Sequence, residues 1–299
     1  MGAGRSIKPG KDNIIASILV IVPALLIYTL IVYYPLISSF AYSVTDFDGG
    51  IRPVNFVGLS NFKEMFSDEI VTAGFYNTIK FTVFTTVFAN LIALMLALVL
   101  DSSIKFKGYL RAVFFIPCLI NYVVISAIFS NILQYDGLLN QLFNYAGLPG
   151  VKLDWFGSKE LALPLLMALN VWQWCGYGAV IYLAGLQSIP NEYYEAAKVD
   201  GSSTASTFFR ITVPLLAPSF TIMTFMSLTG GLKLFEMPYI LTQTGPNNAT
   251  QTLCTAIYTL AFGHQRMGYA TAVSIVFFVM IVGLSVIQVY TMRRSEVQL

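Results

Sequence analysis

Charged residues are scarce in this chain of 299 residues: Asp, Glu, Lys and Arg make up 11% of it, against about 25% in a soluble domain. Hydrophobic residues reach 56%, and the mean hydropathy is +0.70. The formal net charge is only +2, so the chain lacks the basic field that binding to nucleic-acid phosphates requires. This composition excludes a soluble globular enzyme, a disordered chain and a nucleic-acid binder, and it indicates an integral membrane protein.

Histidine and cysteine are also rare. The chain has one histidine, His264, and three cysteines, Cys118, Cys175 and Cys254, which stand far apart among apolar residues. These residues form neither a metal-ligand cluster nor a disulfide framework. We therefore expect no bound metal, a histidine at the surface, and cysteines that pack as small buried side chains.

The phosphate-binding motif G-x-x-x-x-G-K-[ST] is missing as well. The chain has a single Gly-Lys pair, Gly10-Lys11, and Arg5 stands where the first glycine of the motif is required. Because the motif that cradles the phosphates of ATP is absent, we expect that this chain binds no cofactor and does not hydrolyse ATP by itself.

Long uncharged stretches divide the chain, and a helix needs about 20 apolar residues to cross the hydrocarbon of a membrane. The sequence predicts an all-α integral membrane protein with a single domain over 1–299. A further uncharged window, 237–263, contains Gln, Asn, Gly and Pro residues that are costly in lipid, so we interpret it as a loop with an apolar tail. The six predicted spans lie at about 14–42, 75–100, 112–135, 161–189, 211–232 and 267–292.

The distribution of charge predicts the orientation of these spans. With both termini in the cytoplasm, the inner segments carry ten basic and six acidic residues, and the outer segments carry seven basic and nine acidic residues. This asymmetry agrees with the excess of Lys and Arg on the cytoplasmic side of membrane proteins. No Asp or Glu stands at the centre of a predicted span, which argues against a proton-coupled carrier.

The inner loop 190–210 has the pattern of two short helices. Pro190 suits a first helical turn, and Glu192 and Glu195 complement the positive end of the helix. Gly201 is suited to the left-handed conformation that ends a helix. Ser202 or Ser203 is the expected N-cap of the second helix.

The same loop resembles the cytoplasmic signature loop of binding-protein-dependent ABC importer permeases. The matching pattern is Glu195-Ala196-Ala197, two residues, Asp200-Gly201, and then Phe, Ile and Pro at 208/209, 211 and 214. The resemblance extends to the carbohydrate-uptake branch, and within it to the first-permease type of the maltose and glycerol-phosphate systems. The further segments that carry it are Phe56-Val57-Gly58-Leu59-Ser60-Asn61-Phe62, Asn77-Thr78 and Leu241-Thr242-Gln243-Thr244-Gly245-Pro246-Asn247-Asn248-Ala249-Thr250.

The resemblance implies a type I importer permease fold in the bacterial cytoplasmic membrane. It implies three kinds of protein partner: a second permease subunit in a heterodimer, two ATPase subunits that hold ATP and Mg, and an extracytoplasmic solute-binding protein. It also implies that membrane lipid surrounds the chain. The loop would then be a coupling helix that docks on the ATPase. Glu195 would pair with a basic residue there, Ala196 and Ala197 would allow close approach, and Asp200 and Gly201 would fix the turn.

Span four carries the side chains that suit a sugar. Asn170, Trp174 and Tyr177 are spaced by four and three residues, so they share one helix face. Amides bind hydroxyl groups, and aromatic rings pack on the apolar faces of a sugar. By resemblance these three residues and Ser227 fall where the maltose-like permease lines its solute site. Further candidates are Gly231, Asn121 and Tyr122.

Several alternatives stay open. The aromatic residues of span four also suit plain packing between helices, and Lys80 and Lys233 suit snorkelling at the outer membrane surface. An ion-coupled carrier or a channel fits six spans but leaves the signature loop unexplained. Within the resembling family, a non-sugar solute such as glycerol phosphate is the alternative to a sugar, although the span-four face has no Arg or Lys and favours a neutral solute.

Overall fold

The computed structural model describes residues 11–50, 52–148 and 153–294, and within these ranges every regular element is helical. The only strand-like pairing there is an isolated antiparallel bridge between Thr45 and Phe56. The chain divides into two compact units, one formed by 1–63 with 260–275 and the other by 64–259 with 276–299. The prediction of an all-α fold is confirmed for the described residues.

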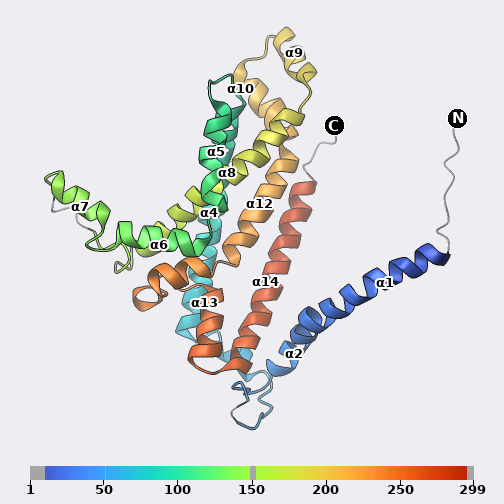
Figure 1. Cartoon of the computed structure of the whole chain (residues 1–299), viewed down its shortest axis with the longest axis vertical. Helices are drawn as coiled ribbons and strands as arrows, with labels where there is room; N and C mark the ends of the chain where they lie inside the picture. The colour runs from blue at the N-terminus through green and yellow to red at the C-terminus, as the bar shows by residue number, and fades with distance from the viewer. Residues whose placement is uncertain (1–10, 51, 149–152, 295–299) are drawn as a thin grey trace. The chain divides into compact units, whose positions relative to one another are not determined.

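The first unit begins with a long apolar helical segment. Helix α1 (Lys11–Tyr28) continues through a π-helical turn (Thr29–Tyr33) into α2 (Tyr34–Tyr42) (Figure 1). The part Ile21–Tyr42 is long and apolar enough to cross a membrane, and none of its side chains is buried. Such a surface needs lipid or another apolar protein surface around it, because water solvates it poorly.

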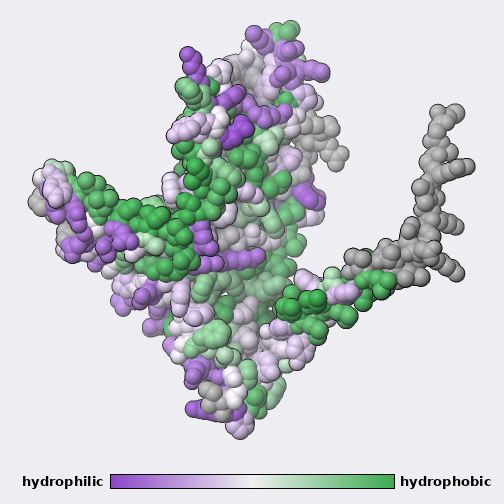
Figure 2. Space-filling view, viewed as in Figure 1, coloured by the Kyte–Doolittle hydropathy of each residue, from purple (hydrophilic) through white to green (hydrophobic). Residues whose placement is uncertain are grey.

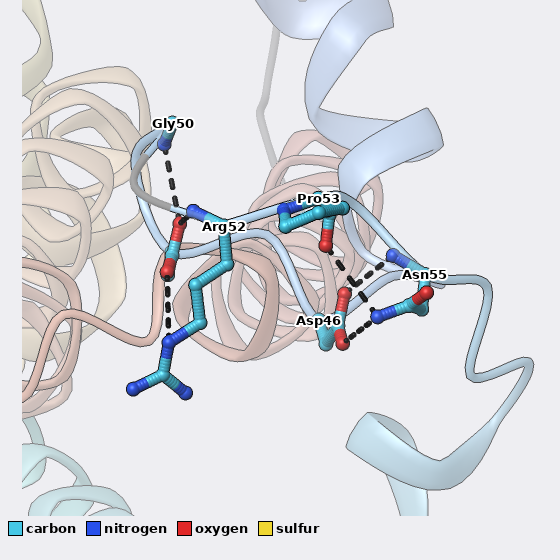
Figure 3. A network of polar contacts seen from close by, with 6 residues as sticks. Asp46, Gly50, Arg52, Pro53 and Asn55 are labelled. Atoms are coloured by element: carbon cyan, nitrogen blue, oxygen red, sulfur yellow. Dashed lines mark hydrogen bonds and ion pairs between the residues drawn. The ribbon is translucent and has the colours of Figure 1, made fainter.

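A short loop follows α2 and is held by polar side chains. Asn61 in α3 (Ser60–Glu64) donates from its amide to the carbonyl oxygens of Ser43 and Thr45, at 2.8 and 2.9 Å. The Asn55 side chain and backbone both donate to Asp46 (Figure 3). These bonds hold the pKa of the Asp46 carboxyl below its ordinary value. Gly58 in this loop has a φ of +60°, the left-handed conformation that glycine adopts readily in a turn.

The second unit contains most of the helices, and its core lies between α4, α8 and α12. Their side chains are packed closely because small residues line the contact: Ala89, Ala93 and Ala97 recur every four residues on α4 and are all buried. The helices of this unit are α4 (Glu69–Asp101), α5 (Lys107–Leu119), α6 (Tyr122–Leu133), α7 (Leu138–Tyr145), α8 (Ala162–Ser188), α9 (Asn191–Val199), α10 (Thr204–Thr207), α11 (Val213–Leu215), α12 (Ala217–Leu232), α13 (Leu253–Tyr258) and the second part of α14 (Met267–Arg293).

Helix α8 contacts α5 through a residue without a side chain. A Cβ atom at Gly176 would collide with the backbone carbonyl oxygen of Phe114 in α5. We expect Gly176→Val to force the two helices apart and to destabilise the protein by about 1–3 kcal/mol. Thermal unfolding of the detergent-purified protein measures this change. Gly283→Ala is the matched control, since a Cβ at Gly283 meets nothing within 4 Å; equal losses in both variants would contradict the close packing of α5 on α8.

The structure agrees only in part with six predicted spans. Four segments are long and apolar enough to cross a membrane: Ile21–Tyr42, Glu69–Asp101, Tyr122–Tyr145 and Met267–Arg293. A fifth is the bent pair Thr204–Leu215 and Ala217–Leu232, whose two halves meet at 65°, between Pro214 and Pro218. Prolines remove a backbone donor and are a common cause of such bends.

The two other predicted spans differ from the structure in different ways. The predicted span 112–135 is divided, because α5 ends at Leu119 and α6 begins at Tyr122. The predicted span 161–189 is one continuous helix, α8, but it is not among the candidate spans, because polar and aromatic residues lower its hydropathy. Window 237–263 contains short helical turns and α13, and its apolar helical stretch Leu253–Gly263 is shorter than the candidate spans.

Candidate functional site

A cavity of about 550 Å³ lies within the second unit, lined from α4, α6, α8 and α12. This volume falls within the range of roughly 300–1,000 Å³ that is usual for small-molecule sites. Six of the seven residues predicted from the sequence to bind solute line it: Tyr122, Asn170, Trp174, Tyr177, Ser227 and Gly231. The tertiary structure therefore brings together in one cavity residues that are up to 109 positions apart in the sequence.

The centre of this cavity wall is a hydrogen-bonded group. The hydroxyl oxygen of Tyr122 accepts a bond of 2.7 Å from the indole N–H of Trp174 and one of 3.2 Å from the amide of Asn170. The rings of Trp174 and Tyr177 meet edge to face, with centroids 5.9 Å apart. The aromatic side chains are thus fixed in orientation, which prepares a rigid surface for an apolar ligand face.

The wall of the cavity that α12 forms is made by residues spaced four positions apart. Met223, Ser227 and Gly231 recur every four residues, so they lie on one face of the helix. Gly231 packs against Thr82 of α4, and a Cβ there would lie 3.0 Å from its Cα and side-chain oxygen. The neighbouring Gly230 has nothing within 4 Å of its Cβ position. These glycines bring α12 close to α4 while leaving open space beside it.

One predicted site residue has a different place. Asn121 does not line the cavity; its side-chain oxygen accepts a bond of 2.9 Å from the backbone N–H of Val123 and so caps α6. An asparagine before a helix is a common N-cap. This local signal was present in the sequence, at the break that divides the predicted span 112–135.

Lys233 lines the cavity, although it was not among the residues predicted to bind solute. The sequence allowed it to snorkel at the outer surface, whereas in the structure it lines the cavity beside Gly231 at the end of α12. It is the only Lys, Arg, Asp or Glu among the lining residues, all of which belong to the described part of the chain. A prediction based on the face of α8 alone missed a cation supplied by another helix.

Two of the segments that carry the family resemblance bind each other. The side-chain amide of Asn77 in α4 donates to the carbonyl oxygens of Asn248 and Gln251, at 2.9 and 3.0 Å. The hydroxyl of Thr78 accepts a bond of 2.9 Å from the N–H of Leu253. Because Gln251 is buried, these bonds satisfy backbone groups that would otherwise be costly away from water.

The loop 190–210 folds as its pattern predicts. Helix α9 runs from Asn191 to Val199, and Gly201 follows with a φ of +70°. The N–H groups of Gly201 and Ser202 donate to the carbonyl oxygens of Lys198 and Ala197, which is the bond pair of a Schellman C-cap. The expected N-cap of the next helix is also confirmed, since the hydroxyl of Ser203 accepts from the N–H of Ser206.

The faces of α9 correct one expectation. Glu195, Ala196, Asp200 and Gly201 are exposed, as a docking surface requires, but Ala197 is only 6% exposed and packs within its own chain. Tyr194 also turns inward: its ring packs on the core, and its hydroxyl lies 3.3 Å from that of Thr212. Figure 2 shows hydrophilic side chains gathered over the end of the second unit that carries α9.

The remaining candidates have simpler places. The three cysteines are free, Cys175 being buried and the other two half-buried, and His264 is exposed. Within the described residues, no group of three or more His, Cys, Asp and Glu side chains is arranged to hold a metal ion.

Several helices long and apolar enough to cross a membrane, with a cavity among helices of the second unit, are features of a multi-pass membrane protein. The chain belongs to the family described as "Binding-protein-dependent transport system inner membrane component", which matches residues 89–297. Members of this family are the permeases of ABC importers, so the chain is a transport subunit and not an enzyme. The predicted family is confirmed.

Relatives and solved structures agree with this assignment. The chain is 35% identical to the probable ABC transporter permease protein YurN of Bacillus subtilis, over 96% of this chain and 99% of that protein. It is 31% identical to the multiple sugar-binding transport system permease protein MsmF of Streptococcus mutans, over 93% and 94% of the two chains. Its fold is similar to a chain of a bacterial alginate ABC transporter solved in complex with a periplasmic protein bound to an alginate pentasaccharide; the TM-score is 0.81 at 24% identity, with 95% of each chain covered.

Proposed function

We propose that this chain is the permease subunit of an ATP-driven ABC importer that moves a sugar or oligosaccharide across the cytoplasmic membrane of a bacterium. The observation that carries the proposal is the cavity in the second unit, where the amide of Asn170 and the rings of Trp174 and Tyr177 lie together. Such a lining suits a ligand with both hydroxyl groups and apolar faces. The naming of MsmF for sugar transport supports the same solute class.

The proposed topology has six spans and both termini in the cytoplasm. Helix α8 serves as a span although its hydropathy is low, because its 27 residues extend about 40 Å. Asn170, Trp174 and Tyr177 line the cavity, and the amide of buried Gln173 donates to the carbonyl oxygen of Ile120, so these polar groups of the helix are not left in lipid. Helices α5 and α6 together form the divided span. The Lys and Arg excess of the inner segments supports this orientation.

The proposed assembly has a second permease, two ATPases that supply ATP and Mg, and a solute-binding protein outside. The family description supports the binding protein. In this assembly α9 is the coupling helix, with Glu195, Ala196, Asp200 and Gly201 on its exposed surface. The hydroxyl contact between Tyr194 and Thr212 ties α9 to the segment that leads into α12, and α12 reaches the cavity.

A second candidate solute follows from Lys233. A cation on the cavity wall favours a solute with an anionic group, such as glycerol phosphate, since opposite charges in a cavity attract more strongly than in water.

Reconstitution tests the proposal. The chain is purified with its second permease and ATPases, placed in proteoliposomes, and supplied with the binding protein and labelled oligosaccharides or glycerol phosphate. We expect uptake only when ATP is present on the side of the membrane that carries the ATPases and the binding protein is present on the opposite side. Uptake driven by an ion gradient without ATP would contradict the proposal, and uptake of glycerol phosphate alone would select the second solute.

A further inference from the structure

Helices α12 and α14 leave a groove between them within the second unit. They are joined by a hydrogen bond of 3.3 Å from the side-chain amide of Gln288 to the carbonyl oxygen of Thr221. Beside this contact lies a groove of about 580 Å³, lined by Phe225 of α12 and by residues of α14. It is distinct from the solute cavity, although Phe225 borders both.

The walls of this groove are mainly apolar and open. Val286 and Tyr290 are each 61% exposed, and Phe225 is 40% exposed. Water binds an apolar groove poorly, and if the groove were empty, its wall atoms would have no dispersion contacts on that side. Its chemistry therefore calls for a hydrocarbon chain.

The C-terminal end of the groove has the opposite character. Arg293 and Arg294 both line it, and the Arg294 guanidinium lies 5.1 Å from the centre of the Tyr290 ring. Among the described residues, no carboxylate forms an ion pair with either arginine. Guanidinium groups bind phosphate through paired hydrogen bonds, and tyrosine and arginine are typical of the level of lipid headgroups.

The order along α14 matches the order along a phospholipid. From Ser285 to Arg293 the helix rises about 12 Å, passing from apolar walls through Tyr290 to the two cations. Basic pockets between helices on the cytoplasmic side are suited to anionic lipid headgroups. A zwitterionic lipid such as phosphatidylcholine carries a cationic amine beside its phosphate, which two arginines repel, whereas an anionic headgroup such as that of phosphatidylglycerol carries none.

We propose that an anionic phospholipid of the inner leaflet binds here, with its phosphate on Arg293 and Arg294 and an acyl chain between Val286, Val289 and Phe225. The proposal rests on the orientation in the proposed function, in which the C-terminal end of α14 faces the cytoplasm. It adds a structural lipid to the transporter and does not depend on which solute is carried.

Native mass spectrometry of the assembled transporter in nanodiscs tests this site. The nanodiscs contain phosphatidylglycerol and phosphatidylcholine in equal amounts, and the double variant R293Q/R294Q is compared with the wild type. We expect at least about tenfold less retained phosphatidylglycerol relative to phosphatidylcholine, from the loss of two cations near the headgroup. The matched control is K105Q/K107Q, which removes two lysines from another inner segment and should retain the lipid.

A second variant tests the groove without changing charge. Val286→Trp fills the space between α12 and α14, and we expect it to lower retention of both phospholipids while Arg293 and Arg294 remain. Unchanged retention in both R293Q/R294Q and Val286→Trp would overturn the proposal. So would efficient cross-linking of Val286→Cys to the second permease, because a protein helix would then occupy the groove. Lipid retention is measured without transport. If the wild-type transporter showed no ATP-driven uptake in the reconstitution experiment, that result would therefore contradict the proposed function and not the lipid site.

Discussion

Glu195→Lys is expected to reduce ATP-coupled uptake at least about a hundredfold, because a charge pair at a protein interface is replaced by repulsion worth several kcal/mol. Glu195 is exposed on α9, so the change removes no contact of the core. The buried Ala197 and the Tyr194–Thr212 contact still hold the helix in place. The permease should therefore fold and reach the membrane, but fail to retain or respond to its ATPase.

Two measurements on the same preparation check this prediction: the amount of ATPase that co-purifies with the permeases, and the ATPase activity stimulated by the loaded binding protein. Glu160→Lys is the control, since it makes the same charge change at an exposed position on the outer side of the proposed topology. Normal uptake by Glu195→Lys would remove α9 from the coupling interface. A similar loss in both variants would show that net charge, and not position, is responsible.

Asn170→Ala is expected to raise the KM for uptake by about 10- to 100-fold, which corresponds to the loss of one or two hydrogen bonds in a buried site. Asn170 lines the cavity and donates to the hydroxyl of Tyr122. Its removal takes away an amide that can bind the solute. It also removes one of the two hydrogen bonds that hold the Tyr122 hydroxyl, the group to which Trp174 donates. Tyr177→Ala should have an effect of similar size through lost ring contact.

Trp172→Phe provides the matched control on the same helix. Trp172 is 44% exposed, packs edge to face on Phe129 and does not line the cavity. We expect its KM to stay within about twofold of the wild type, since exposed substitutions are usually nearly neutral. If Asn170→Ala lowers thermal stability but leaves KM and kcat unchanged, these residues only pack between helices.

Helix α9, the proposed coupling helix, shows what local sequence determines. Its boundaries follow from Pro190 and Gly201, and its caps involve residues within a few positions of each other. Interactions of this kind do not depend on the rest of the fold, so the sequence predicted them correctly. Which face turns inward is a different matter: Ala197 is buried, and Tyr194, three positions earlier on the same face, reaches Thr212, 18 positions away in the sequence.

The proposed solute cavity shows the same division. The spacing of Asn170, Trp174 and Tyr177 predicts a shared face on α8, because helical geometry fixes it. Lys233 enters the same cavity from α12, and its role depends on how closely Gly231 lets that helix approach Thr82 of α4. The charge of the cavity was therefore not available from one helix face.

The sequence by itself determined the membrane class, the family and the caps of α9, because composition, motif spacing and short-range hydrogen bonds are properties of adjacent residues. The break that divides the span 112–135 involves the contact of Asn121 with Val123, two positions away, so it belongs with these local features. The tertiary structure decided the inward turn of Ala197 and the cation on the cavity wall. Each of these depends on contacts between residues far apart in the chain. Such contacts arise only when helices pack, and small residues such as Gly176 and Gly231 set how closely they do so.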